Sequence, residues 1–177
     1  MEQCSSEQTA MYKKSILDRL HSSTFNLHSS TYIDLTGGFG VDFSFMSHGF
    51  RRAVYVERQE HLCDMASHNF RCLDMDNVEV VCEEAEEYLD YCEKADVIYL
   101  DPARRDSHGG RTFAISDCTP DVIALLPLLI KKAKLVMLKL SPMLDWRKAI
   151  ADLGKKYIIE VNIVSVENEC KELLLLL

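Results

Sequence analysis

The part of the sequence best suited to binding a small molecule is a glycine-rich turn, Asp34-Leu-Thr-Gly-Gly-Phe-Gly40. It follows the β-branched and aromatic run Thr31-Tyr-Ile33, and a second expected strand, 52–57, ends in the acid Glu57. Glycine lets a backbone approach a ligand closely. An open α/β sheet builds a nucleoside pocket from a strand, a glycine turn, a helix and a further strand whose terminal carboxylate binds the ribose diol. The sequence therefore predicts a nucleoside site at this turn.

The spacing of the turn argues against a dinucleotide. It reads D-x-T-G-G-x-G and not G-x-G-x-x-G, the motif that points a helix N-terminus at a pyrophosphate. Asp42, at the start of the next expected helix, would repel a pyrophosphate but would tolerate an ammonium or sulfonium centre. The alternative interpretation is a glycine turn that only connects a strand to a helix.

Four acids stand at the ends of expected strands or just beyond them. They are Asp34, Glu57, Glu84 and Asp101. In a parallel sheet with right-handed crossovers these strand ends meet at the edge where ligands bind. Each acid taken singly could be a helix cap or a solvated charge. Glu83 or Glu86 could replace Glu84 if the third strand ends elsewhere.

Hydrophobic periodicity places these residues on alternating strands and helices. Helices are expected over 7–20, 41–48, 59–73, 84–92, 120–132 and from Ser141-Pro142 to Gly154. Strands are expected over 31–34, 52–57, 77–82, 95–101, 134–140, 157–166 and 170–177, with a polar loop over 102–118. This pattern predicts an α/β fold: a seven-stranded, mostly parallel sheet with helices on both faces and a C-terminal antiparallel hairpin.

Composition limits the partners. The formal net charge is −8, and residues 72–101 hold eleven acids and one lysine, so the remainder is slightly basic. This argues against tight nucleic-acid binding by this domain alone, although a basic rim or an attached domain could supply it. Seven scattered cysteines without a CxxC pair indicate reduced thiols and no metal site. With no signal peptide and no apolar run of about 18 residues, we expect a cytoplasmic protein without a membrane partner.

Along nearly its whole length the chain resembles the class I S-adenosylmethionine-dependent methyltransferases, which have a Rossmann-like fold. The resemblance implies a methyltransferase domain over 31–177, after a helical lead-in over 1–30. It implies that S-adenosylmethionine is the cofactor, with Glu57 on the ribose and Glu84 near the adenine. The other cofactor-binding residues that it implies are Asp34, Thr36, Gly37, Gly38, Gly40 and Asp101. Thr36 replaces the family's usual first loop glycine, as it does in some RNA methyltransferases.

Asp101-Pro-Ala-Arg-Arg-Asp106 occupies the position of the family's catalytic loop. Amino-group methyltransferases carry [DNS]-P-P-[FYW] there, so Asp101 and Pro102 would hold the acceptor. Arg104 and Arg105 would contact a base or a phosphate, and Arg104 is included with the catalytic residues. Ala103 and Arg104 depart from the family's second proline and aromatic residue, and the two arginines could instead be a solvated pair. The cysteines that covalent pyrimidine methyltransferases place after strands four and five are absent.

The D-P-A-R-R loop and the opening residues resemble a bacterial RNA-methyltransferase-like group whose members carry a C-terminal THUMP-like domain. This resemblance implies methylation of RNA, at a purine nitrogen, by a catalytic core that belongs to a longer protein. The alternatives are a protein or small-molecule methyltransferase, and a module that binds the cofactor without catalysis. A nicotinamide-dependent dehydrogenase is a more distant alternative.

Overall fold

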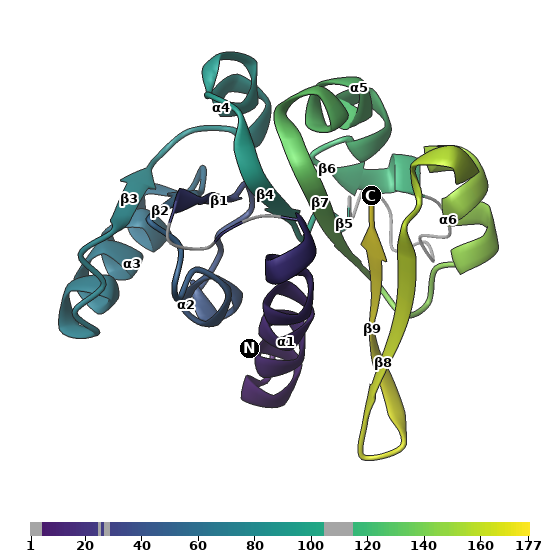
Figure 1. Cartoon of the computed structure of the whole chain (residues 1–177), viewed down its shortest axis with the longest axis horizontal. Coiled ribbons are helices and arrows are strands. Elements are labelled where there is room, and N and C mark those ends of the chain that lie inside the picture. The colour runs from purple at the N-terminus through teal and green to yellow at the C-terminus, as the bar shows by residue number, and fades with distance from the viewer. Residues whose placement is uncertain (1–4, 25, 27–28, 105–114) are drawn as a thin grey trace.

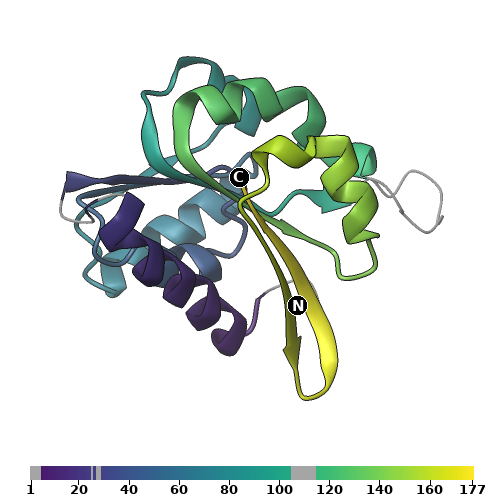
Figure 2. The ribbon, with the colours of Figure 1, turned by 45° about the vertical axis from the view of Figure 1, so that its right-hand side comes forward.

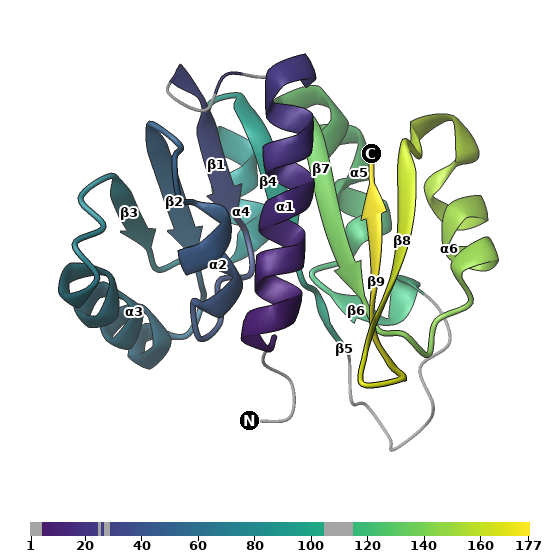
Figure 3. The same cartoon turned by 60° about the horizontal axis from the view of Figure 1, so that its bottom comes forward.

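The computed structural model describes residues 5–24, 26, 29–104 and 115–177. Within these residues the strands of the main sheet are β1 (Thr31–Asp34), β2 (Arg52–Val56), β3 (Val78–Val81), β4 (Ala95–Leu100), β7 (Ala133–Leu140), β8 (Glu160–Val166) and β9 (Glu169–Leu176). They lie in the order β3-β2-β1-β4-β7-β9-β8 (Figure 3). The first five are parallel, and β9 pairs antiparallel with both β7 and β8. The predicted fold class is confirmed.

Helices cover both faces of this sheet (Figure 1). They are α1 (Glu7–Thr24), α2 (Val41–Met46), α3 (Glu60–Cys72), α4 (Ala85–Tyr91), α5 (Val122–Lys132) and α6 (Trp146–Leu153). The first three lie on one face and the last three on the other (Figure 3). Adjacent strand residues face opposite sides, so Tyr32 packs under α2 while Ile33 belongs to the cluster that contains residues of α4 and α5. The alternation therefore gives the sheet one apolar core on each side.

The C-terminal hairpin of β8 and β9 projects beyond the rest of the domain (Figure 2). Its turn lies at Glu167 and Asn168, whose φ angles are 53° and 62°. Two consecutive left-handed residues are typical of a tight hairpin turn. The hairpin predicted from the sequence is confirmed.

Several boundaries predicted from the sequence are wrong, and capping explains two of them. The first helix, expected over 7–20, extends to Thr24. The Asp121 side chain accepts hydrogen bonds from the amides of Ile123 and Ala124, so α5 begins after it and Pro120 lies outside the helix. Asp145, not Ser141, caps α6 in the same way. The expected strand 157–166 begins only at Glu160, because Lys155–Tyr157 forms a 3-10 turn.

The loop predicted over 102–118 contains regular structure at its two ends. The short strands β5 (Ala103–Arg104) and β6 (Cys118–Thr119) pair antiparallel, and a 3-10 turn, Ile115–Asp117, precedes β6. No helix among the described residues is long and apolar enough to cross a bilayer.

A buried lysine fixes α1 to the domain. Lys13 has no exposed surface, and its Nζ lies 3.1 Å from Asp42 Oδ1 and 2.6 Å from Glu172 Oε2. It also donates to the Ser5 hydroxyl at 3.2 Å. Lys13 thus joins α1 to the start of α2 and to β9. This charge is compensated only when all three elements are in place.

Replacing Lys13 by methionine should therefore destabilise the fold. Lys13→Met leaves the buried Glu172 and the mostly buried Asp42 without their cation, and we expect a loss of about 3–5 kcal/mol in the free energy of unfolding, measured in urea. Lys14→Met is the matched control, because Lys14 lies in an exposed pair with Asp18. It should change the free energy by less than about 0.5 kcal/mol. Equal effects of the two substitutions would contradict this role for Lys13.

Candidate functional site

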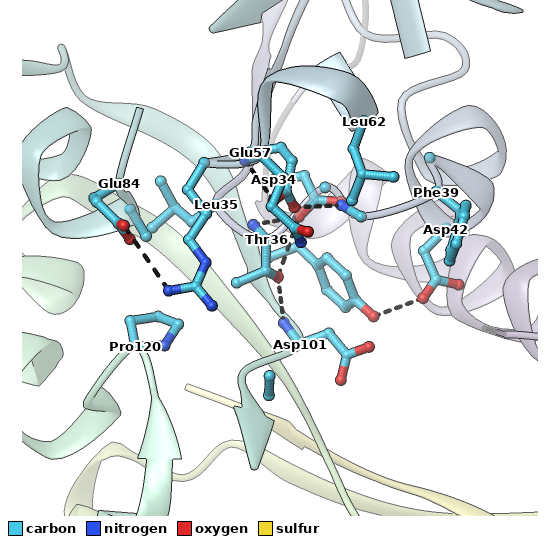
Figure 4. A pocket seen from close by; sticks show the side chains of 18 of the residues that line it. Asp34, Leu35, Thr36, Phe39, Asp42, Glu57, Leu62, Glu84, Asp101 and Pro120 are labelled. Carbon is cyan, nitrogen blue, oxygen red and sulfur yellow. Dashed lines mark hydrogen bonds and ion pairs between the residues drawn. The ribbon is translucent and has the colours of Figure 1, made fainter. Parts of the chain in front are cut away.

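The acids predicted to meet at one edge of the sheet do meet there. A cavity of about 250 Å³ opens at the carboxyl ends of the parallel strands. Its lining includes Asp34, Glu57, Glu84 and Asp101 (Figure 4). Glu84 lies at one end of the view, Glu57 in the middle and Asp42 at the opposite end. The cavity is therefore elongated and acidic along its length.

Asp34 and Thr36 organise the turn after β1. The Asp34 carboxylate accepts a hydrogen bond from the Thr36 amide at 2.9 Å, which closes a local turn. The Thr36 hydroxyl accepts from the amide of Asp101 at 2.6 Å. A glycine at position 36 could not make this second bond. Thr36 thus ties the glycine loop to the segment that follows β4.

Two of the loop glycines are required by close approach or by backbone conformation. A Cβ on Gly37 would lie 2.1–2.5 Å from ring atoms of Tyr55, a fully buried side chain. Gly40 has a φ of 77°, in the left-handed region that favours glycine, and its missing Cβ leaves room for Phe70. The Tyr55 hydroxyl donates to the carbonyl of Gly38 and fixes the middle of the loop. Tyr55 and Phe70, which pack against the loop from the core, therefore hold its backbone in one conformation.

Glu57 keeps part of its hydrogen-bonding capacity free. Its two carboxylate oxygens accept from the amides of Gly38, at 2.9 Å, and Gln59, at 3.0 Å. A carboxylate offers about four acceptor sites. The side chain is thus oriented by two backbone amides and can still accept two hydrogen bonds from the cavity, as a ribose diol requires.

Glu84 is the most exposed of the four acids. It precedes α4, and its side chain, 49% exposed, lies 3.8 Å from the Arg58 guanidinium. Glu83 and Glu86 also line the cavity. The geometry therefore leaves open which of these three acids would face an adenine amino group.

Asp101 lies between two cavities. A second cavity, of about 550 Å³, shares Asp101, Ala103 and Ser5 with the first and is lined further by Pro102 and Lys139. Lys139 Nζ forms an ion pair with Asp101 Oδ2. Although burial lowers the pKa of Lys139, the Asp101 carboxylate raises it above its usual value. Lys139 therefore stays charged and favours the ionised form of Asp101.

Burial at the edge raises the pKa of two carboxyls. Asp34 is 1% exposed, and burial, reinforced by the nearby carboxylates Asp42 and Asp101, holds its pKa well above its usual range. Burial also raises the pKa of Asp101, against the opposing effect of Lys139. A cationic ligand would relieve both effects, whereas an anionic one would increase them.

Of the two predicted arginines, only Arg104 lies within the residues that the structure describes. The backbone of Arg104 pairs with Cys118 in the β5–β6 ladder, and Arg105 lies outside the described residues. Their predicted contacts with a base or a phosphate stay a prediction. Among the described residues no group of histidine, cysteine and acidic side chains is arranged to bind a metal.

Two charged residues of the site, Asp42 and Lys139, are not among those that the sequence predicts to bind the cofactor or the acceptor. Asp42 lines the first cavity, and its Oδ2 accepts from the hydroxyls of Tyr99, at 2.8 Å, and Ser5, at 2.7 Å. Lys139 is the second. Its signal is a single charge within the otherwise apolar end of β7, Leu135-Val-Met-Leu-Lys-Leu140. A charge in such a run requires a buried partner, but sequence alone does not name that partner.

Only the comparison with solved structures finds proteins similar to this chain. No protein-family model matches the chain, and no curated protein matches it. The structure of a proposed methyltransferase from Porphyromonas gingivalis W83 superposes with a TM-score of 0.84 and 32% identity over 99% of this chain. The chain spans 41% of the length of that protein.

More distant structures share the fold over most of their length. A proposed rRNA methylase from Clostridium thermocellum has a TM-score of 0.63 and 16% identity, covering 96% of this chain and 94% of its own. A proposed methyltransferase from Streptococcus mutans, solved in complex with S-adenosylhomocysteine, has a TM-score of 0.59 and 15% identity, covering 84% and 87%. The chain has the Rossmann-like methyltransferase fold.

The raised pKa of Asp34 predicts that its charge destabilises the fold. The folded pKa lies above the unfolded value near 3.8, so this cost is absent at low pH and develops as pH rises through the folded pKa. In Asp34→Asn the amide oxygen can still accept from Thr36. We expect urea unfolding to show a higher free energy of unfolding than the unmodified protein at neutral pH, by an amount that shrinks on acidification.

The control is Asp64→Asn, because Asp64 is exposed on α3. It should change the free energy of unfolding by less than about 0.5 kcal/mol. A neutral or destabilising effect of Asp34→Asn at every pH would contradict the argument.

Proposed function

We propose that this protein is an S-adenosylmethionine-dependent methyltransferase. The observation that carries the proposal is the elongated acidic cavity at the carboxyl edge of a methyltransferase fold, which adjoins a second cavity across Asp101. One cavity suits the cofactor and the other suits the acceptor. The similar Porphyromonas protein, of which this chain spans less than half, supports the same activity.

The residues of the first cavity fit the cofactor part by part. Glu57, oriented by two amides, has free acceptor sites for the ribose diol. Glu84, or one of its acidic neighbours, would accept from the adenine amino group. The methionine end would then lie beside the loop of Gly37 and Gly38, where the raised pKa of Asp34 favours a cationic ligand. S-adenosylmethionine supplies an electrophilic methyl group on a positively charged sulfur.

Asp101 would position the acceptor. Its carboxylate can accept an N–H of the acceptor nitrogen, orient the lone pair of that nitrogen toward the first cavity, and take the proton that the nitrogen gives up when it is methylated. Burial raises the pKa of Asp101, which makes it a better proton acceptor near neutral pH, while Lys139 keeps it ionised beforehand. Methyl transfer is an in-line displacement, so this positioning contributes much of the rate.

For the acceptor, we propose a purine nitrogen in RNA. Support comes from Thr36 in the glycine loop, from Asp101-Pro102 at the junction of the cavities, and from the proposed rRNA methylase that shares the fold. The acidic net charge of −8 fits a catalytic domain that acts with an accessory RNA-binding domain of a longer protein. Ala103, which replaces the second proline of the amino-group motif, favours the alternative of a cofactor-binding module without catalysis.

The ribose assignment predicts a loss of cofactor affinity in Glu57→Ala. Losing a charged acceptor for the diol should weaken S-adenosylhomocysteine binding by about 1.5–3 kcal/mol, or roughly 10- to 150-fold, in titration calorimetry. Glu79→Ala is the control, because Glu79 lies on β3 in an exposed pair with Arg52. Unchanged affinity in Glu57→Ala would show that the ribose assignment is wrong.

The reaction is tested with a methyl-labelled cofactor and separate RNA, protein and small-metabolite fractions. We expect label in RNA, and a loss of at least about 100-fold in rate in Asp101→Asn when S-adenosylmethionine is saturating. Label in protein or in small metabolites would reassign the acceptor. Cofactor binding without label in any fraction would support the non-catalytic module.

A further inference from the structure

The segment that follows β7, residues 141–148, lines part of the second cavity and has an unusual surface. Ser141, Pro142 and Leu144 line that cavity. The chain then enters α6, which begins at the same edge of the sheet at which β7 ends (Figure 3). Because three residues of this segment line the second cavity, we expect a large substrate whose reacting group enters that cavity to lie close to residues 141–148.

Two large apolar side chains are exposed here. Met143 is 66% exposed, and Trp146, the only tryptophan of the chain, is 39% exposed. The Arg147 guanidinium lies 5.1 Å from the centroid of the Trp146 ring, so an indole and a cation already form a stack. A flat aromatic group can extend such a stack.

The segment around Trp146 is slightly basic, in contrast to the whole chain. Residues 141–148 contain one arginine, one lysine and one aspartate, a net charge of +1 in a chain of net charge −8. Asp145, the acid nearest to Trp146, accepts from the amides of Arg147, at 2.9 Å, and Lys148, at 3.4 Å. Its charge is therefore partly satisfied by the helix start, while Arg147 and Lys148 stay exposed.

We propose that Met143, Trp146, Arg147 and Lys148 form a stacking shelf for single-stranded RNA. Trp146 would stack on a base that flanks the target nucleotide, and the two cations would bind neighbouring phosphates. Aromatic rings interleaved with cations are the usual means of holding single strands without sequence preference. The inference rests on the proposed function, because it assigns RNA as the substrate that enters the second cavity.

The single tryptophan makes the shelf directly observable. Intrinsic fluorescence of this chain, with S-adenosylhomocysteine present, is titrated with a single-stranded 12-mer oligoribonucleotide, where 12 is about the length one domain can cover. We expect saturable quenching that weakens as salt is raised. By anisotropy of a labelled oligoribonucleotide, Trp146→Ala should lower RNA affinity by roughly 5- to 100-fold.

Charge reversals at opposite edges of the sheet provide the matched comparison. Arg147→Glu should lower RNA affinity about tenfold or more, whereas Lys131→Glu, in the last turn of α5 at the other edge, should have little effect. Neither substitution, nor Trp146→Ala, should change the affinity for S-adenosylhomocysteine, which also verifies folding.

Three results would overturn the shelf: no saturable quenching by RNA, equal effects of Arg147→Glu and Lys131→Glu, or quenching by an acidic peptide in place of RNA. Failure of the unmodified protein to bind S-adenosylhomocysteine would instead refute the proposed function. The two failures are therefore distinguishable.

Discussion

The balance of buried charge at the carboxyl edge of the sheet is the constraint on which the rest of the structure depends. Carboxylates gather there with two lysines, Lys13 and Lys139. They include Asp34, Asp42, Glu57, Asp101 and Glu172. Each lysine joins segments that are distant in sequence, so the ion pairs hold the fold and shape the cavities together. Because the acids outnumber the lysines, the site retains negative charge that a cationic ligand would balance.

The glycine loop shows how the fold prepares this edge for a ligand. Asp34 closes the turn, Thr36 ties it to Asp101, and Tyr55 supports it from the core. None of these contacts requires a ligand. A loop held in this way loses little conformational freedom on binding, which favours affinity. Gly37 is essential to the arrangement because the Tyr55 ring fills the space in which a side chain would begin.

Asp101 gives the two cavities a common wall. Its backbone amide donates to the Thr36 hydroxyl of the glycine loop, and its carboxylate forms an ion pair with Lys139 of β7. The proposed chemistry needs a group at this junction that accepts a proton and faces both reactants. The basic segment after β7 then provides a surface for a polymeric acceptor on a chain whose net charge would otherwise repel it.

Much of this arrangement follows from the sequence alone. The alternation of apolar runs determined the strands, the helices and their parallel pairing, and four strand-end acids were correctly brought to one edge because parallel strands share a direction. Helix starts were predicted less well. Thr119 and Ser141 are also capping residue types near these two helix starts, and only the backbone geometry selects Asp121 and Asp145.

What only the tertiary structure decided are the contacts between segments far apart in the chain. Lys13 and Glu172 are 159 residues apart, and Lys139 and Asp101 are 38 apart. The local sequence pattern shows that a charge in an apolar run is unusual, but it does not identify the residue of opposite charge with which it forms an ion pair. That depends on how the sheet orders its strands and where α1 packs across them. The sequence therefore determined at which edge of the sheet the strand-end acids gather, and the packing determined which charges face one another there.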